Sequence, residues 1–274
     1  MNHTIEINDT HVTLPKAFVK LGKKAYMEKY VDRGELRFAP AYEFSHMQEG
    51  RDGVADRYEG SLFYPISKLY IAPLLSDDEN GVVYGKPVKL ADTAIQRLTT
   101  PTIQRIPFHC LYCYPNPAMN AIIRLDNYDQ VVQEFPDYDT AVIIYNPLEF
   151  LNKLESKFEI YANHVKYTDR TPLEDELPND IHCLYYKREE YKEQNEFRIA
   201  LPKLRIEKPE IYEVGSLSDI AYCVPLKYLK YGIIITDNND DYQLLKKRCE
   251  DLGFGVGNHT EHADAEKNVV DSIK

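Results

Sequence analysis

The segment from Tyr191 to Leu201 constrains the fold of this chain more than any other. From Phe197 to Leu201, large apolar residues alternate with smaller or polar ones, which is the period of a half-buried strand. The polar residues before it are predicted to form the loop or helix end that leads into this strand. Gln194 and Glu196 then lie two positions apart at the opening of the strand, and we expect their side chains to share one face.

A carboxamide and a carboxylate side by side at a strand edge can act together on a ligand. Gln194 can donate and accept hydrogen bonds that orient the ligand, while Glu196 can accept from a hydroxyl group or stabilise developing positive charge. A simpler interpretation stays open. In that interpretation both residues are exposed polar positions, and Arg198 is the ion-pair partner of Glu196 on the same face.

Composition limits the class of protein. The chain has 274 residues, of which 43% are hydrophobic and 28% charged, as in ordinary globular proteins. Its net charge of −11 argues against broad electrostatic capture of nucleic acid or of anionic membrane. It has no apolar run of membrane-spanning length, and its N-terminus lacks a signal-peptide pattern. Five irregularly spaced cysteines argue against a disulfide framework, so we expect a cytoplasmic protein without a membrane partner.

Hydrophobic periodicity predicts more strands than helices. We predict a single α+β domain over residues 1–257 with a mainly antiparallel or mixed sheet, because regular β–α alternation is rare. The polar, acidic residues 258–274 are predicted to be a disordered tail. The predicted helices cover residues 15–33 (ended by Gly34), 42–47, 147–158 and 241–252, and the predicted strands cover 3–14 (as a strand or hairpin), 35–39, 61–74, 86–91, 102–114, 140–145, 160–167, 182–186, 196–201, 220–224 and 231–236.

Two groups of residues resemble the signatures of a largely uncharacterised bacterial domain family. The N-terminal group is Gly34-Glu35-Leu36-Arg37-Phe38, then Tyr42, Glu49, Arg51, Asp56 and Glu59-Gly60, and the C-terminal group is Lys187, Tyr191, Gln194, Glu196 and Arg198. Their order, with a basic residue on an early strand and a glutamate on a late strand, is similar to that of ADP-ribosyltransferases. The resemblance touches both ends of residues 16–235.

The resemblance implies a split-sheet fold and an enzyme that uses NAD as a substrate. Glu196 would stabilise the ribosyl cation, Gln194 would orient the acceptor or the ribose, and Arg37 would grip the pyrophosphate. Arg51 or Arg57 would assist Arg37, and Tyr112 or Tyr114 would stack on a ring of the ligand. The sequence does not choose between these tyrosines, because Phe108 to Tyr114 departs from the central-strand pattern of toxin-type transferases.

Some relatives with this motif order look like toxins of phage-defence or toxin–antitoxin systems. The resemblance therefore implies a macromolecular acceptor, which is RNA, DNA or protein, and an antitoxin or chaperone as a possible partner. Two alternatives remain. One is a non-catalytic module that binds a nucleotide or a partner, and the other is a structural partner in such a complex, which uses the acidic tail from Glu261 onward.

Cys110 and Cys113 form half of a zinc or redox motif, but a second pair is missing and strand residues at this spacing face opposite ways. We therefore predict no metal there. The transferase hypothesis also makes a geometric prediction: Arg37 and Glu196 face a common cavity, Glu196 is partly buried beside Gln194, and a tyrosine lines the wall. The simpler interpretation predicts instead that Arg37 pairs locally and that Glu196 points to solvent.

Overall fold

The structure, a computed structural model, describes residues 4–7, 10–46, 59–66, 69–78, 81–91, 94–98, 101–114, 121–168, 180–235 and 239–251. The chain divides into two compact units, the first comprising Met1–Asn116 and Ile123–Ile233 and the second Pro117–Ile122 and Ile234–Lys274. The single domain predicted over residues 1–257 stays a prediction, and the predicted tail, 258–274, lies outside the described residues.

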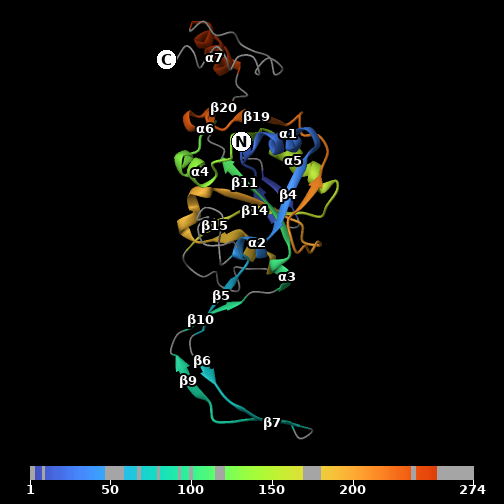
Figure 1. Ribbon diagram of the computed structural model, residues 1–274, viewed down its shortest axis with the longest axis vertical. Coiled ribbons are helices and arrows are strands. Elements are labelled where there is room, and N and C mark those ends of the chain that lie inside the picture. The colour runs from blue at the N-terminus through green and yellow to red at the C-terminus, as the bar shows by residue number, and fades with distance from the viewer. Residues whose placement is uncertain are drawn as a thin grey trace. The chain divides into compact units, whose positions relative to one another are not determined.

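The described helices and strands alternate irregularly along the chain (Figure 1). The α-helices are α1 (Lys24–Arg33), α2 (Ala41–His46), α3 (Pro101–Gln104), α4 (Tyr128–Glu134), α5 (Pro147–Glu155), α6 (Tyr228–Tyr231) and α7 (Asn239–Asp251), and two 3₁₀ helices are η2 (Asp180–Tyr185) and η3 (Glu189–Gln194). The strands are β1 (Thr4–Ile7), β2 (Thr10–Thr13), β3 (Ala17–Gly22), β4 (Glu35–Pro40), β5 (Leu62–Ile66), β6 (Leu69–Ile71), β7 (Leu74–Asp78), β8 (Gly81–Tyr84), β9 (Val88–Ala91), β10 (Ala94–Leu98), β11 (Pro107–Tyr114), β12 (Ala121–Ile123), β13 (Thr140–Ile144), β14 (Tyr161–His164), β15 (Lys166–Tyr167), β16 (Tyr186–Lys187), β17 (Glu196–Ala200), β18 (Glu210–Glu213), β19 (Ala221–Pro225) and β20 (Ile233–Ile235).

An eight-stranded sheet forms the centre of the first unit. Its main path runs β14-β17-β11-β3-β13-β19, and β4 joins it by pairing with both β11 and β18. Every pair in this sheet is antiparallel. These pairings confirm the predicted α+β class with a mainly antiparallel sheet.

The sheet forks at β11. On one side β11 pairs with β17 from Phe108 to Tyr112. On its other side, residues Tyr112 to Tyr114 pair with β3, whereas Pro107 and Phe108 pair with β4. The residues in between, 109–111, have no ladder partner on that side among the described strands. Backbone groups of β11 that face the fork must therefore be satisfied by side chains, water or a ligand.

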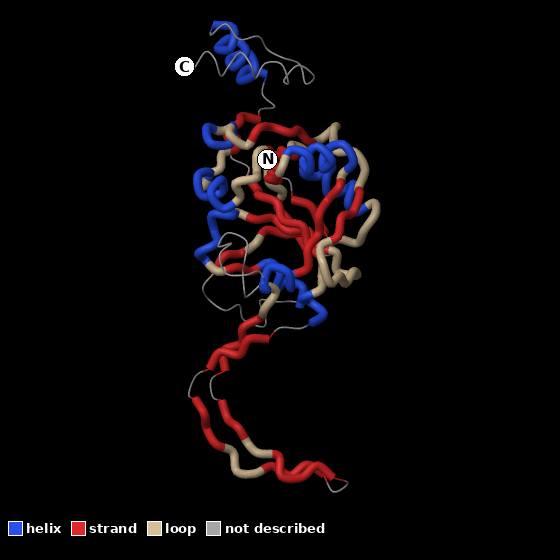
Figure 2. Tube along the Cα trace, viewed as in Figure 1, coloured by secondary structure: helices blue, strands red, loops and turns tan. Residues whose placement is uncertain are grey.

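The two faces of the sheet are covered by different elements. One face packs on α1 and α5, through Met27, Tyr30, Val31, Phe150, Leu151 and Leu154 (Figure 1). Phe197 and Ile199 of β17 belong to this larger core. Because successive side chains of a strand alternate, Glu196 and Arg198 point to the other face. There a second cluster joins Phe108 and Ala200 to residues of α2, α3 and η2. Figure 2 shows the blue helices flanking the red strands of this unit.

Two predicted elements are wrong in type. Residues 17–22 form β3 rather than the first half of a helix, and α1 begins only at Lys24. Gly34 ends α1 as predicted, with a left-handed φ of 66°. The predicted strand over 182–186 is mostly the 3₁₀ helix η2, followed by the short strand β16. In both cases a short apolar run fits either a strand or a helical turn, so periodicity alone does not decide.

Between residues 62 and 98, the described strands form three antiparallel ladders, β5 with β10, β6 with β9 and β7 with β8. In the second unit the described part includes most of β12 and β20, which pair with each other, and α7. Within the described ranges, no helix combines the length and the apolar character that crossing a membrane requires.

Candidate ligand-binding site

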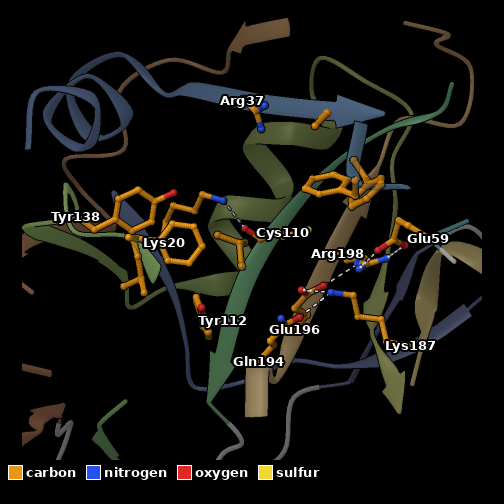
Figure 3. A pocket seen from close by; sticks show the side chains of 16 residues that line it. Lys20, Arg37, Glu59, Cys110, Tyr112, Tyr138, Lys187, Gln194, Glu196 and Arg198 are labelled. Carbon is orange, nitrogen blue, oxygen red and sulfur yellow. Dashed lines mark hydrogen bonds and ion pairs between the residues drawn. The ribbon is translucent and has the colours of Figure 1, made fainter. Parts of the chain in front are cut away.

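A cavity of about 180 Å³ lies at the fork, on the face of the sheet opposite α1 and α5 (Figure 3). The described residues that line it come from five strands (β3, β4, β11, β16 and β17) and from the segments around them. They are Lys20, Leu21, Arg37, Ala39, Phe44, Glu59, Phe108, Cys110, Leu111, Tyr112, Phe135, Tyr138, Lys187, Gln194, Glu196 and Arg198. Four of these side chains are basic and two are acidic, so the lining is positive although the whole chain carries a net charge of −11.

Lys187 is the hub at one end of the cavity. Its buried ammonium donates to Gln194 Oε1 at 2.6 Å and to Glu196 Oε1 at 2.9 Å. It also lies 5.1 Å from the centre of the Tyr191 ring, within range of a cation–π contact. Three residues of the C-terminal signature, Tyr191, Gln194 and Glu196, therefore contact the ammonium group of a fourth, Lys187.

Gln194 lies beside Glu196 as predicted, but it belongs to a different element from the predicted one. It does not lie on the strand: it ends the 3₁₀ helix η3, and Asn195 turns the chain into β17 with a positive φ of 41°. The shared strand face was therefore the wrong reason for placing Gln194 beside Glu196. The two side chains are neighbours because both accept a hydrogen bond from Lys187.

Arg198 forms two further ion pairs in this cluster. Its Nε donates to Glu196 Oε2 at 2.8 Å, and its two Nη groups donate to the oxygens of Glu59 at 2.6 and 2.9 Å. Its guanidinium also donates to the carbonyl of Leu184 and stacks over the ring of Phe108, 4.7 Å from the centroid. The side chains of Arg198 and Glu59 are 1% and 2% exposed, so these charges are satisfied by one another.

Both oxygens of Glu196 are thus ion-paired, and its side chain is 13% exposed. Burial raises the pKa of this carboxyl group, but the nearby charges and hydrogen bonds of Arg198 and Lys187 outweigh that effect and lower the pKa to about 2. Glu196 is therefore a carboxylate at any physiological pH. Burial is the largest single effect and lowers the pKa of Lys187, but the charges of Glu196 and Glu59 act together against it, and the net shift of the pKa is upward.

Lys20 lies at the other end of the cavity, near Tyr138 (Figure 3). Its ammonium donates to the backbone carbonyl of Cys110 at 2.8 Å and so fills part of the gap in the fork. Within the described part of the chain Lys20 has no ion-pair partner, and its side chain is half-buried. Burial is the main cause that lowers the pKa of Lys20, and the positive charge of Arg37 adds to it.

Arg37 lines the same cavity from β4. Its side chain is 50% exposed, and its Nη2 donates to both oxygens of Glu43, at 2.7 and 2.9 Å. His109 of β11 supports β4. Its Nδ1 donates to the backbone carbonyl of Arg37 at 2.9 Å, and its Nε2 lies 3.0 Å from the hydroxyl of Tyr30 in α1. Burial holds the pKa of His109 well below its usual value, so the ring is neutral and supports β4 as a hydrogen-bond donor.

The structure brings four of the predicted site residues together, since Arg37, Tyr112, Gln194 and Glu196 all line this cavity. Glu196 is largely buried rather than pointing to open solvent, whereas Arg37 does pair locally, with Glu43. The geometric prediction is confirmed on the shared cavity, the burial of Glu196 and the tyrosine in the wall. Arg51 and Arg57 lie outside the described residues. Tyr114 ends β11, and its side chain lies outside the description too.

Sequence reasoning gave no role in the site to Glu59, Lys187 or Lys20. It proposed Arg198 only as the ion-pair partner of Glu196 under the simpler interpretation, and this ion pair is confirmed. Glu59 and Lys187 belong to the two signatures, but the sequence did not show their contacts with Arg198 and Glu196. Lys20 had no signal, because its segment was predicted to be a helix.

The cysteines of β11 face opposite sides of the sheet. Cys110 lines the cavity, whereas Cys113 belongs to the larger core, where it lies 3.3 Å from His164 Nδ1. Burial raises the pKa of both thiols to about 12, so neither is a thiolate at neutral pH. Among the described residues, no three His, Cys, Asp or Glu side chains are grouped so that they could hold a metal ion.

Comparisons of the chain with protein-family models, with curated proteins and with solved structures return no match.

Proposed function

We propose that this cavity binds NAD and that the protein transfers ADP-ribose from NAD to a macromolecular acceptor, RNA, DNA or protein. One observation carries the proposal. Arg37 and Glu196, the two residues that the motif order pairs, come from distant segments and line one cavity together with Gln194 and Tyr112. In this proposal the split-sheet architecture of ADP-ribosyltransferases corresponds to the fork at β11.

The chemistry requires a carboxylate next to the carbon from which nicotinamide leaves. As that bond breaks, positive charge develops on the ribose, and a fixed anion stabilises it. Glu196 stays ionised because its pKa is about 2. A carboxylate has about four lone-pair sites, so the bonds from Lys187 and Arg198 leave capacity for a ribose hydroxyl. Gln194 would orient the ribose or the acceptor, and Tyr112 would stack on a ring.

The size of the cavity limits how much of the ligand it encloses. Sites for whole small molecules are usually about 300–1,000 Å³, whereas this cavity measures about 180 Å³. We therefore place the phosphoribosyl part of NAD inside it and the remainder outside. From the motif order we also propose that this transferase acts as a toxin or defence effector and that its partner is an antitoxin or a chaperone.

A second candidate is a binding module without catalysis. One observation favours it: two cations already neutralise Glu196, which weakens the field that an oxocarbenium-like ion would experience. Such a module would hold a nucleotide through the basic residues of the cavity and leave it intact.

Nicotinamide release separates the two candidates. The purified chain is incubated with NAD, alone and with cell lysate as a source of acceptors, and free nicotinamide is quantified. The transferase releases nicotinamide in proportion to enzyme, faster with lysate. The module binds NAD in a calorimetric titration and releases none. Absence of both binding and release would exclude the transferase and any module that binds NAD.

A further inference from the structure

Among the described residues, no carboxylate forms an ion pair with Lys20. Every other basic residue of the cavity has an acidic partner: Arg37 has Glu43, Lys187 has Glu196, and Arg198 has both Glu196 and Glu59. In the described part of the chain Lys20 has a neutral partner instead, the carbonyl of Cys110. A half-buried ammonium that is not neutralised is unfavourable, so an anion entering the cavity would gain most of its binding energy here.

Arg37 supplies a second, partly unused cation. A single nitrogen, Nη2, makes both of its bonds to Glu43, and its Nε and Nη1 groups make none to the described part of the protein. Arg37 lies close enough to Lys20 for its charge to lower the pKa of the lysine. The two side chains come from β3 and β4, the strands that separate at the fork.

We infer that Lys20 and Arg37 form a subsite at the fork for the phosphate or pyrophosphate group of the ligand. Lysine acts as a point charge that satisfies one phosphate oxygen, and the remaining Nε and Nη1 donors of Arg37 are available for other phosphate oxygens. The inference rests on the cavity of the proposed function and adds Lys20 as its main anion-binding residue. It places the phosphate beside Lys20 and Arg37 and leaves Glu196 to the ribose.

The first test measures the affinity of the full chain for pyrophosphate, with adenosine as the uncharged comparison. The wild-type protein is expected to bind pyrophosphate and not adenosine. Because a hydrogen bond to a charged group contributes roughly 1.5–3 kcal/mol, Lys20→Met should weaken binding at least about tenfold. Lys20→Arg, which keeps the charge, should retain most of it. Lys29→Met, the same loss of charge on the exposed side of α1, should change nothing.

A second variant leaves Lys20 and its contact with Cys110 intact. Glu43→Gln removes the carboxylate that competes for Arg37, so pyrophosphate should bind several-fold more tightly. Equal affinities in Lys20→Met and Lys29→Met would overturn the inference. If Glu43→Gln binds pyrophosphate no more tightly than wild type, the role assigned to Arg37 is wrong. This result does not depend on whether Lys20→Met folds.

Two further measurements separate this inference from the proposed function. ADP-ribose competing with pyrophosphate identifies the phosphate of a nucleotide as the ligand, whereas competition by inorganic phosphate alone identifies a free-phosphate site. Lys20-dependent pyrophosphate binding without nicotinamide release supports the subsite and contradicts the transferase. Nicotinamide release with pyrophosphate affinity unchanged in Lys20→Met supports the transferase and contradicts the subsite.

Discussion

Arg198 and Glu59 form a buried two-point ion pair, 2.6 and 2.9 Å long, between residues 139 positions apart in the sequence. The pair joins the end of the N-terminal signature to the strand that carries the C-terminal one. Through its third nitrogen, Nε, Arg198 also fixes the carboxylate of Glu196 at the cavity. The Arg198 side chain thus holds the two signature segments together and also fixes the position of Glu196 in the cavity.

Replacing Arg198 should therefore destabilise the protein strongly. Arg198→Met removes the guanidinium that pairs with Glu59 and Glu196, and removal of one member of a buried ion pair typically costs about 3–5 kcal/mol of unfolding free energy. Arg105→Met is the matched control, because Arg105 pairs with Glu207 at the surface, where both side chains are at least half exposed. That variant should lose less than about 1 kcal/mol. Denaturant titrations measure the unfolding free energies of the two variants. Equal losses of unfolding free energy would contradict the role of the buried ion pair in holding the two segments together.

Gly60 should not tolerate a side chain. Its φ is +63°, and a Cβ would lie 2.9 Å from Ala41 Cβ and 3.1 Å from Gln104 Nε2. Gly215 also has a positive φ, +91°, but a Cβ there would meet nothing within 4 Å. We expect Gly215→Ala to cost about 1–2 kcal/mol from backbone strain, and Gly60→Ala to cost roughly 1–2 kcal/mol more from crowding. Thermal unfolding of the two variants compares them, and a smaller loss at Gly60 would be inconsistent with the packing of Glu59 and Gly60.

Acid should weaken the protein through Glu196. The folded-state pKa is about 2, below the ordinary value of 4.5, so the unfolded chain binds a proton first as pH falls. The stabilisation is complete above pH 4.5 and is lost as the pH falls from 4.5 towards 2. Its size, from the difference in pKa, is on the order of 3 kcal/mol. In Glu196→Gln this contribution is absent, so the difference in unfolding free energy between wild type and variant should shrink over that range. A difference independent of pH would show that the ion pairs do not hold Glu196 ionised.

Sequence patterns predicted the strand of Glu196 and the strand of Arg37, because each has a clear alternation and a clear boundary residue. They could not predict the fork, since pairing between β3, β4 and β11 depends on residues far apart in the chain. Lys20 is a site residue that could not be found for this reason. In a predicted helix it was an unremarkable polar residue, whereas in β3 it reaches the open carbonyl of Cys110. Lys187, likewise, became part of the site only through contacts that cross between segments.

The most direct test of the transferase is the rate of nicotinamide release from NAD by Glu196→Gln, measured against wild type and Glu193→Gln. Glu193 is an exposed glutamate three positions earlier, so its variant makes the same chemical change outside the cavity. Because Glu196→Gln also weakens the ion pairs, each variant is assayed at a temperature at which circular dichroism shows it folded. The proposal predicts that Glu196→Gln loses release by about a hundredfold or more while Glu193→Gln keeps it. Equal release by wild type and folded Glu196→Gln would contradict the assignment of Glu196, and no release by the wild-type protein would contradict the transferase itself.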